Sequence, residues 1–386
     1  MLQTLAVANY RSLHELAVPL AGLNLVTGDN GSGKSNLYRA LRLLAQTARG
    51  GVATALAGEG GLESALWAGP ERISRAMREG EMPVQGTARS TPVSLRLGFA
   101  GEDFGYAIDL GLPVPGNSMF DRDPQIKNES IWAGPFLRSS NLLVERRGSV
   151  VRRRAGRSWE VVEEHLSGFD SLFSQLADPQ RMPEVLALRE YIRRWRFHDH
   201  FRSDAAAPAR QPCMAIRTPV LADDGHDLAA AWQTIIEIGD GQGLQRSLED
   251  AFPGAQVRIE GWEGRLSLKF AQPGLLRPLA ASELSDGTLR YLLLIAALHT
   301  PRPPPLLVLN EPETSLHPDL LPALARLIIN AAARSQLWVV SHASRLIAAL
   351  QEDPACNALR LHKEFSQTRL WGVGNLEGPA WYWPQR

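Results

Sequence analysis

The sequence predicts an α/β protein with a mainly parallel core sheet flanked by helices, an antiparallel β subdomain and a mixed α/β insertion. Three observations support this fold class. A short apolar strand runs into a glycine-rich turn and then a helix between residues 23 and 47. Apolar and polar residues alternate between residues 91 and 112, and buried strands alternate with helices after residue 275. Strands that alternate with helices form parallel sheets whose faces the helices cover.

Three apolar runs of strand length occupy the first 28 residues, and the last of them stops at Gly28. From Lys34 onward, Leu37 and Leu41 recur at helical spacing, which predicts a helix. The order is therefore strand, glycine-rich turn and helix. The alternating residues between 91 and 112 flank a short polar connector, which predicts an antiparallel hairpin.

The middle of the chain combines strand and helix patterns. Residues 141–164 have strand character, and helices are predicted over 183–201 and 228–239. No heptad repeat holds for three turns, which excludes a long coiled-coil arm.

From residue 275 the alternation of strands and helices becomes regular. A capped helix is predicted over 282–300, a buried strand over 303–311, an amphipathic helix over 318–333 and a second buried strand over 335–342. We therefore expect three parts along the chain, which are an N-terminal half-domain at 1–114, an insertion at 115–274 and a C-terminal half-domain at 275–386.

Composition limits the classes of protein to which the chain can belong. The 41 basic and 41 acidic residues balance, so no global field draws the protein to nucleic acid or to a membrane. The two cysteines, Cys213 and Cys356, lie far apart and suit a reducing cytosol. The N-terminus lacks the pattern of a signal peptide, and no apolar run is long enough to span a bilayer. We expect a soluble cytoplasmic protein without a membrane partner.

The segment "GDNGSGKS", residues 28–35, matches the complete G-x-x-x-x-G-K-[ST] phosphate-loop pattern. It lies between a predicted strand and a predicted helix, which is the context that this motif requires. Its glycines allow backbone N–H groups to face a phosphate at the positive end of a helix. Lys34 would bridge the β- and γ-phosphates of a nucleotide, and the Ser35 hydroxyl would coordinate Mg²⁺.

Two further segments carry polar residues next to predicted elements. In "ELSDGT", residues 283–288, Ser285 is placed to cap the helix that follows, and taken alone this is no more than a helix cap. In "LLVLNEPETSLHP", residues 306–318, a buried strand delivers Asn310 and Glu311. A third buried strand ends at His342, where a lone histidine is more often a packing residue.

The order of these motifs, from the phosphate loop through a long insertion to "LSDGT", "LLVLNEPETSLHP" and "VVSH", resembles the ATPase heads of the ABC superfamily. The resemblance is to the branch shared by SMC, Rad50 and RecF proteins, and within it to the OLD-like predicted ATPases. It covers about 1–110 and 275–350, whereas the middle of the chain is placed only loosely.

The resemblance implies a head that sandwiches two ATP molecules with Mg²⁺ in a homodimer. It assigns Glu311, His342 and Lys34 to catalysis, and Ser35 and Asn310 to the metal. Glu311 would orient or deprotonate the attacking water, and His342 would hydrogen-bond the γ-phosphate or that water. The residues expected to contact the nucleotide are Gly28, Asn30, Gly31, Ser32, Gly33, Lys34, Ser35, Asn36 and Arg11 from one subunit, with Ser285 and Gly287 from the other.

The chain departs from the pattern of the family at several positions, among them Thr288 and His317, and two further positions bear directly on the chemistry. Asn310 stands where the resembled heads carry an aspartate that holds Mg²⁺ through a water. An amide oxygen can still accept that hydrogen bond, but one negative charge is lost, so we expect slow hydrolysis of ATP. Asp286 would bring a negative charge close to the bound phosphate and oppose tight closure of the dimer.

Arginine runs suggest a partner besides a second copy of the chain. One run lies at 146–157 and another at 193–202, and both could contact DNA or RNA phosphates. Solvated faces paired with acidic residues are the alternative interpretation. We expect a role in DNA repair or maintenance, or in anti-phage defence, with nucleic acid or with an effector such as a nuclease supplied in trans.

Two other functions stay open. The first is a nucleotide-holding scaffold that regulates a partner nuclease. The second is an ABC transporter subunit, against which the long insertion and the "LHP" sequence at residues 316–318 argue.

Overall fold

The computed structural model describes residues 1–71, 74–79, 81–83, 93–114, 116–176, 178–199, 201–372 and 378–385. The chain folds into two compact units whose sequences interleave. Unit 1 comprises Met1–Ala21, Gly28–Arg194 and Leu359–Arg386, and unit 2 comprises Gly22–Thr27 and Trp195–Ala358. The predicted division into three consecutive parts stays a prediction.

Unit 1 is built on an eight-stranded sheet in the order β2-β1-β4-β5-β6-β7-β8-β9, in which every neighbouring pair is antiparallel. Its strands are β1 (Leu2–Tyr10), β2 (Leu13–Pro19), β4 (Leu95–Gly101), β5 (Phe104–Gly111), β6 (Gln125–Ala133), β7 (Leu142–Arg147), β8 (Val150–Ala155) and β9 (Ser158–Glu163). The pairing of β4 with β5 confirms the predicted hairpin, of which residues 91 and 92 lie outside the described residues.

Helix α1 follows the glycine-rich turn and packs against β1 within unit 1. The helices of this unit are α1 (Lys34–Thr47), α2 (Val52–Gly58), α3 (Leu62–Ala65), α4 (Arg75–Arg78), α5 (Leu172–Gln175) and α6 (Pro183–Arg193). Near the C-terminus, Trp381 packs edge-on against Trp132 of β6, with ring centroids 5.7 Å apart. The C-terminal segment therefore covers part of the sheet.

The prediction of one helix over 183–201 is wrong at its C-terminal end. Helix α6 ends at Arg193, and the chain then forms β10 (Arg196–His198), which pairs in parallel with β15 (Leu306–Asn310). This pairing belongs to unit 2, where Trp195 is fully buried. Hydrogen bonds to a strand more than a hundred residues away override the helical pattern of the sequence.

The core sheet of unit 2 is parallel and runs in the order β10-β15-β16-β3. It contains β3 (Leu23–Gly28) and β16 (Gln336–Val340) besides the two strands already given. Next to β3 lies β17 (Cys356–Glu364), which begins in unit 2 and continues into unit 1, where β18 (Gln367–Leu370) pairs with it antiparallel. With the antiparallel sheet of unit 1, this parallel core confirms the predicted α/β class.

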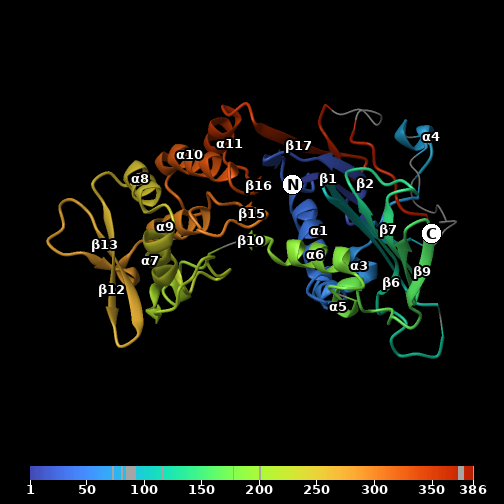
Figure 1. The fold of residues 1–386 in the computed structure, drawn as a ribbon. Coiled ribbons are helices and arrows are strands. Elements are labelled where there is room, and N and C mark those ends of the chain that lie inside the picture. Colours follow the sequence, from blue (N-terminus) through green and yellow to red (C-terminus); the bar gives the residue numbers. More distant parts are fainter. Residues whose placement is uncertain are drawn as a thin grey trace. The chain divides into compact units, whose positions relative to one another are not determined.

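Helices and a small antiparallel sheet complete unit 2, and Figure 1 shows β12 and β13 beside α7 and α8. Its helices are α7 (Leu228–Ile238), α8 (Gly241–Ala251), α9 (Asp286–Leu298), α10 (Leu321–Ala332) and α11 (Ser344–Gln351), with single 3-10 turns at Pro208–Arg210, Ala281–Glu283 and Pro318–Leu320. The small sheet contains β11 (Cys213–Met214), β12 (Gln256–Trp262), β13 (Arg265–Ala271) and β14 (Leu279–Ala280).

One hydrophobic core connects these elements of unit 2. Apolar side chains from α7, α9 and α10 pack with those of β15 and β16, and nearly all of α9 is buried. Packing on nearly all sides therefore fixes the position of α9 within this unit. Among the described residues, no helix has the length and apolar content that crossing a bilayer requires.

Candidate nucleotide site

The glycine-rich turn connects the end of β3 to the start of α1, as the sequence predicts. Gly33 precedes the helix in a left-handed conformation, and no side chain of the described residues caps the helix. The first backbone N–H groups of a helix have no partner within it. The turn therefore presents free N–H groups at the positive end of a fourteen-residue helix, which suits an anion.

Two glycines of this turn lie against backbone and side-chain atoms that exclude any larger residue. A Cβ on Gly28 would lie 2.3 Å from the carbonyl oxygen of Leu361, and a Cβ on Gly33 would lie 2.1 Å from Oγ1 of Thr368. Both glycines also have positive φ, at 145° and 109°. Close approach and backbone conformation together explain why glycine occupies these positions.

A chain of hydrogen bonds within unit 1 fastens the turn. The Thr368 hydroxyl donates to the carbonyl of Ser32 at 2.8 Å and lies 2.7 Å from the Ser12 hydroxyl. Because Thr368 uses its only proton on a carbonyl, Ser12 must donate to Thr368. The Asn36 amide then donates to Ser12 at 2.8 Å. The side chain of Asn36, which was predicted to contact nucleotide, thus stabilises the turn indirectly, through the hydroxyl groups of Ser12 and Thr368.

The side chains of the turn fit a phosphate group. The Lys34 ammonium donates to the carbonyls of Gly28 at 2.6 Å and Asp29 at 3.2 Å, so it lies over the loop. The Ser32 hydroxyl is buried and has no hydrogen-bond partner among the described residues. An ammonium group, an unsatisfied hydroxyl and free N–H groups together form a donor set for an anion, which agrees with the predicted triphosphate.

Arg11, another predicted nucleotide contact, is engaged elsewhere in unit 1. Its guanidinium forms an ion pair with Glu59 at 2.9 Å, and the Tyr10 hydroxyl donates to the same carboxylate at 2.6 Å. Burial, followed by the effect of Glu59, holds the pKa of Tyr10 well above its usual value. In this structure Arg11 organises the turn between β1 and β2, and a phosphate contact would have to compete with Glu59.

In unit 2, three parallel strands run toward one edge of the core sheet, and β15 and β16 end there in register. Val340 pairs with Val26 on one side and with Asn310 on the other. Asn310 is the last residue of β15, which therefore ends one residue before the predicted end of this strand, and Glu311 follows it. Ligands of open α/β sheets bind at the carboxyl ends of parallel strands.

Glu311 and His342 lie side by side after their strands. Oε1 of Glu311 is 3.6 Å from Nδ1 of His342, and both side chains are about half exposed. Glu311 has a positive φ of 49°, an uncommon conformation for a residue with a side chain. Its N–H donates to Val340 at 2.8 Å and its carbonyl accepts from Arg290 at 3.2 Å. Backbone hydrogen bonds thus hold the predicted catalytic residue in this conformation.

The sequence did not single out Glu313 and Arg290, two buried charged residues next to this pair. Oε1 of Glu313 accepts hydrogen bonds from the Ser341 hydroxyl at 2.7 Å and from the N–H of His342 at 2.9 Å. Burial lowers the pKa of Arg290, whereas the carboxylates of Glu313 and Glu311 act in the opposite direction. In the sequence, these two residues could have been noticed only as a glutamate two positions after Glu311 and as an arginine within an apolar helix.

Ser285 and Gly287, the residues expected to contact the nucleotide from a second subunit, lie at the start of α9. The Ser285 hydroxyl accepts from the N–H of Thr288 at 3.1 Å, which confirms the predicted helix cap. A Cβ on Gly287 would lie 2.7 Å from the carbonyl oxygen of Ser315, which lies in the turn that follows β15 and Glu311. Only a glycine allows the start of α9 to approach that turn so closely.

The arginine run at 146–157 is mostly neutralised within unit 1. Arg146 is buried on Glu129, whereas Arg147 and Arg152 share Glu145. A further pair joins Arg153 to Glu160 at 2.9 Å, and Arg154 stacks over Trp159. This pairing favours the alternative of a structural, acid-paired surface over a dense phosphate-binding patch.

Comparison with known proteins gives one family match. The family described as "AAA domain, putative AbiEii toxin, Type IV TA system" matches residues 23–348, which is most of the chain. No curated protein is similar enough to match.

Three solved structures of SMC heads align with the chain at low identity. A crystal structure of the SMC head bound to the C-winged helix domain of ScpA is 12% identical with a TM-score of 0.47, over 96% of this chain and 97% of that chain. The SMC head domain from Thermotoga maritima is 13% identical with a TM-score of 0.47, over 97% and 99%. The Smc head with an extended coiled coil, bound to the C-terminal domain of ScpA from Pyrococcus furiosus, is 11% identical with a TM-score of 0.47, over 96% and 95%.

Proposed function

Because the chain belongs to the family of AAA domains described with the AbiEii toxin, we propose that it is a slow ATP-hydrolysing switch that dimerises around two ATP molecules with Mg²⁺. Family membership confirms the predicted relationship to ATPase heads, and it supports ATP binding and hydrolysis in general. Dimerisation, low turnover and the biological role are the finer parts of the proposal.

One observation carries the proposal. The strands that lead to the phosphate loop, to Glu311 and to His342 run in parallel toward the same edge of the core sheet of unit 2. Side chains that follow neighbouring parallel strands can act on one ligand. The arrangement supports a nucleotide site at that edge.

Residues 28–35 would hold the triphosphate. The free N–H groups at the start of α1 would bind the β-phosphate, and Lys34 would leave its loop carbonyls to neutralise the β- and γ-phosphates. The Ser35 hydroxyl would bind Mg²⁺ directly, and Asn310 would hold it through a water. Bound Mg²⁺ supplies neutralisation of charge on the phosphates.

Glu311 would position the attacking water and accept its proton, since it is half exposed and its backbone is held on both sides. His342 lies close enough to share a hydrogen bond with that water or with the γ-phosphate. Asn310 lacks the charge of an aspartate, which supports low turnover.

The second copy would supply Ser285 and Gly287. Ser285 is exposed at the positive end of α9, a thirteen-residue helix. Its side chain and the following N–H groups can turn toward a γ-phosphate bound by the partner. ATP would then act as the bridge between two copies, and hydrolysis would release them.

Measuring the size of the Glu311→Gln variant by light scattering with ATP and Mg²⁺ tests this proposal. We expect a nucleotide-dependent dimer and no phosphate release, whereas Glu352→Gln, a change at an exposed carboxylate after α11, keeps wild-type hydrolysis. A variant that binds ATP yet stays monomeric would overturn the dimer. Wild-type phosphate release no greater than that of Glu311→Gln would favour the nucleotide-holding scaffold, and co-purification with a membrane protein would favour a transporter subunit.

For the biological role we propose DNA maintenance or anti-phage defence, with nucleic acid or an effector nuclease as partner. Arg154 and Arg157 have no carboxylate partner in the described part of the chain, so they are the members of the arginine run best able to contact phosphate. Replacing both with Glu should abolish salt-sensitive retention of DNA or RNA, whereas Arg153→Glu should affect it less. Equal retention by both variants would exclude this surface.

A further inference from the structure

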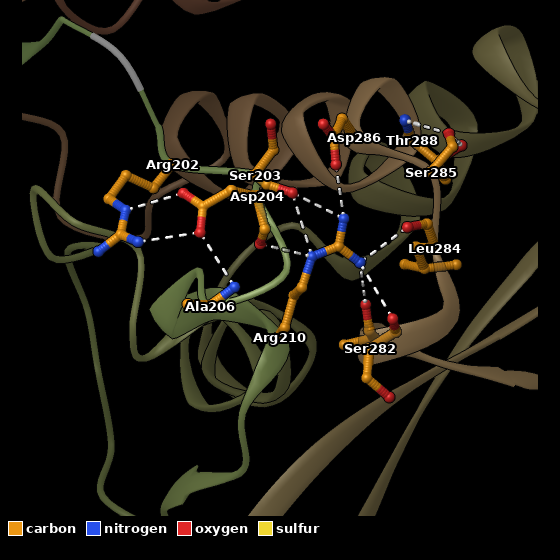
Figure 2. Close-up of polar contacts among 11 residues, drawn as sticks. Arg202, Ser203, Asp204, Ala206, Arg210, Ser282, Leu284, Ser285, Asp286 and Thr288 are labelled. Carbon is orange, nitrogen blue, oxygen red and sulfur yellow. Dashed lines mark hydrogen bonds and ion pairs between the residues drawn. The ribbon is translucent and has the colours of Figure 1, made fainter.

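Arg210 is buried beside the start of α9, and its five N–H groups reach six acceptor atoms, all within unit 2 (Figure 2). Only 6% of its side chain is exposed. Its Nε and one terminal nitrogen donate to the carbonyls of Ser203 and Asp204. The other terminal nitrogen donates to the carbonyls of Ala281, Ser282 and Leu284 at 3.1, 3.2 and 2.7 Å.

The last three acceptors belong to residues 281–285, a segment that ends at Ser285 and that we call the signature loop. The segment lies between β14 and α9. Its single 3-10 turn at Ala281–Glu283 provides the Ala281 carbonyl with one long hydrogen bond of 3.4 Å from the N–H of Leu284, so these carbonyl groups need further donors. A planar guanidinium offers five N–H donors in a fixed fork, so it can bind several carbonyls at once. Arg210 therefore fixes the path of the backbone that delivers Ser285 and Gly287.

Arg210 also neutralises Asp286. One terminal nitrogen lies 2.7 Å from Oδ1 of Asp286, whose side chain is 57% exposed. The sequence predicted that this carboxylate would oppose an approaching phosphate. Its pairing with a buried cation removes most of that repulsion, because the two charges largely cancel for a third charge that lies farther away than their separation.

We propose that Arg210 is a positioning residue of the signature loop, which shapes the loop and cancels the charge of Asp286 so that Ser285 and Gly287 can contact a phosphate. This inference rests on the proposed function for its consequence, which is closure of the ATP-bound dimer. Its structural half, the shape of the loop, is independent of that function. Arg210 does not itself touch the nucleotide.

The neighbouring pair of Arg202 and Asp204 provides a matched control, also drawn in Figure 2. Arg202 binds the Asp204 carboxylate through two hydrogen bonds of 2.9 Å, but both side chains are more than half exposed. Exposed pairs of this kind contribute little to stability. Arg202→Met therefore removes the same chemical group from the same segment without touching the signature loop.

The experiment compares Arg210→Met, Arg210→Lys and Arg202→Met, each in the Glu311→Gln background. ATP-dependent dimerisation is measured by light scattering, and nucleotide affinity of the monomer is measured with a fluorescent ATP analogue. Hydrogen exchange reports on the backbone amides of residues 284–288 without nucleotide. We expect Arg210→Met to weaken dimerisation by about tenfold or more, with faster exchange of these amides and less than about a twofold change in monomer affinity.

Two further variants separate charge from shape. Arg210→Lys keeps a positive charge that can pair with Asp286, but an ammonium group cannot bind all the carbonyl groups. Compared with Arg210→Met, this variant should therefore recover part of the dimerisation. Adding Asp286→Asn to Arg210→Met should also recover dimerisation by several-fold, because it removes the unpaired carboxylate. A merely structural role would not produce this second recovery.

The outcomes distinguish this inference from the proposed function. If Glu311→Gln alone stays monomeric with ATP, the proposed dimer fails, and the exchange of residues 284–288 still decides whether Arg210 shapes the loop. Equal exchange and equal dimerisation in Arg210→Met and Arg202→Met would overturn the inference. Absence of any recovery by Asp286→Asn would overturn its electrostatic half.

Discussion

The buried carboxylate of Glu313 accepts a hydrogen bond from the backbone N–H of His342 at 2.9 Å. The same oxygen accepts from the hydroxyl of Ser341 and from the N–H of Ala343 at 3.2 Å. One carboxylate thus orders the turn that follows β16, in which His342 faces Glu311. The geometry of the predicted catalytic pair depends on a residue that does not belong to it.

Glu313→Ala should destabilise unit 2 strongly. The change removes the acceptor of the buried Ser341 hydroxyl and of the His342 N–H, whereas the Ala343 N–H keeps the Ser341 hydroxyl oxygen at 3.2 Å. The free energy of unfolding should therefore fall by about 3 kcal/mol. Glu313→Gln keeps an acceptor oxygen and should lose about 1 kcal/mol. Urea unfolding measures both values. A loss in Glu313→Ala no larger than that of the exposed control Glu352→Ala would contradict this role.

Asn310→Asp should increase the affinity of the nucleotide complex for Mg²⁺. The change restores a negative charge beside the metal, and such outer contacts alter metal affinity by about tenfold or more. We expect half-maximal ATP hydrolysis at a correspondingly lower Mg²⁺ concentration, together with faster turnover. The exposed Asn330→Asp, on α10, adds the same charge elsewhere in unit 2 and should leave the Mg²⁺ titration unchanged. Identical titrations of both variants would show that Asn310 does not act on the metal.

Gly28→Ala should damage the phosphate loop. The new Cβ would lie 2.3 Å from a backbone oxygen of Leu361, so the end of β3 or β17 must shift. We expect a loss of about 1–3 kcal/mol in stability and at least about a tenfold loss in ATP affinity. Gly22→Ala, at the other end of β3, meets no atom within 4 Å and serves as the control. Calorimetry of ATP binding checks the result, and equal affinities in the two variants would refute it.

Unit 2 should lose stability as the pH falls from about 6.5 to about 4. Burial and then the charge of Arg334 lower the pKa of His299 to about 4. In the unfolded chain this group titrates near 6.5, so the unfolded state takes up the proton first and gains stability relative to the folded state. The loss from this group approaches about 3 kcal/mol at the acidic end.

His299→Gln should flatten that pH dependence, as urea unfolding at a series of pH values would show. His226 provides a control of opposite sign. Its hydrogen bond to Asp224 raises its pKa, so its small contribution is present at low pH and disappears as the pH rises. If wild type and His299→Gln lost stability in parallel on acidification, the assignment to His299 would be wrong.

Local patterns predicted much of the fold and of the candidate site. Residues 28–33 form the predicted turn before α1, and Ser285 caps α9 as expected. The extension of α6 to residue 201 was wrong because pairing of β10 with β15 is a contact between distant segments. The individual roles assigned to Lys34, Glu311 and His342 stay predictions until their variants are measured.

The sequence by itself determined the order of strands, turns and helices and the identity of the phosphate loop, because periodicity and glycine spacing act over a few residues. Only the tertiary structure revealed that Thr368 fastens Ser32 from 336 positions away, that Glu313 orders the turn of His342, and that Arg210 neutralises Asp286. Buried polar groups must find partners wherever the folded chain brings them. Spacing along the sequence cannot reveal which partners those are.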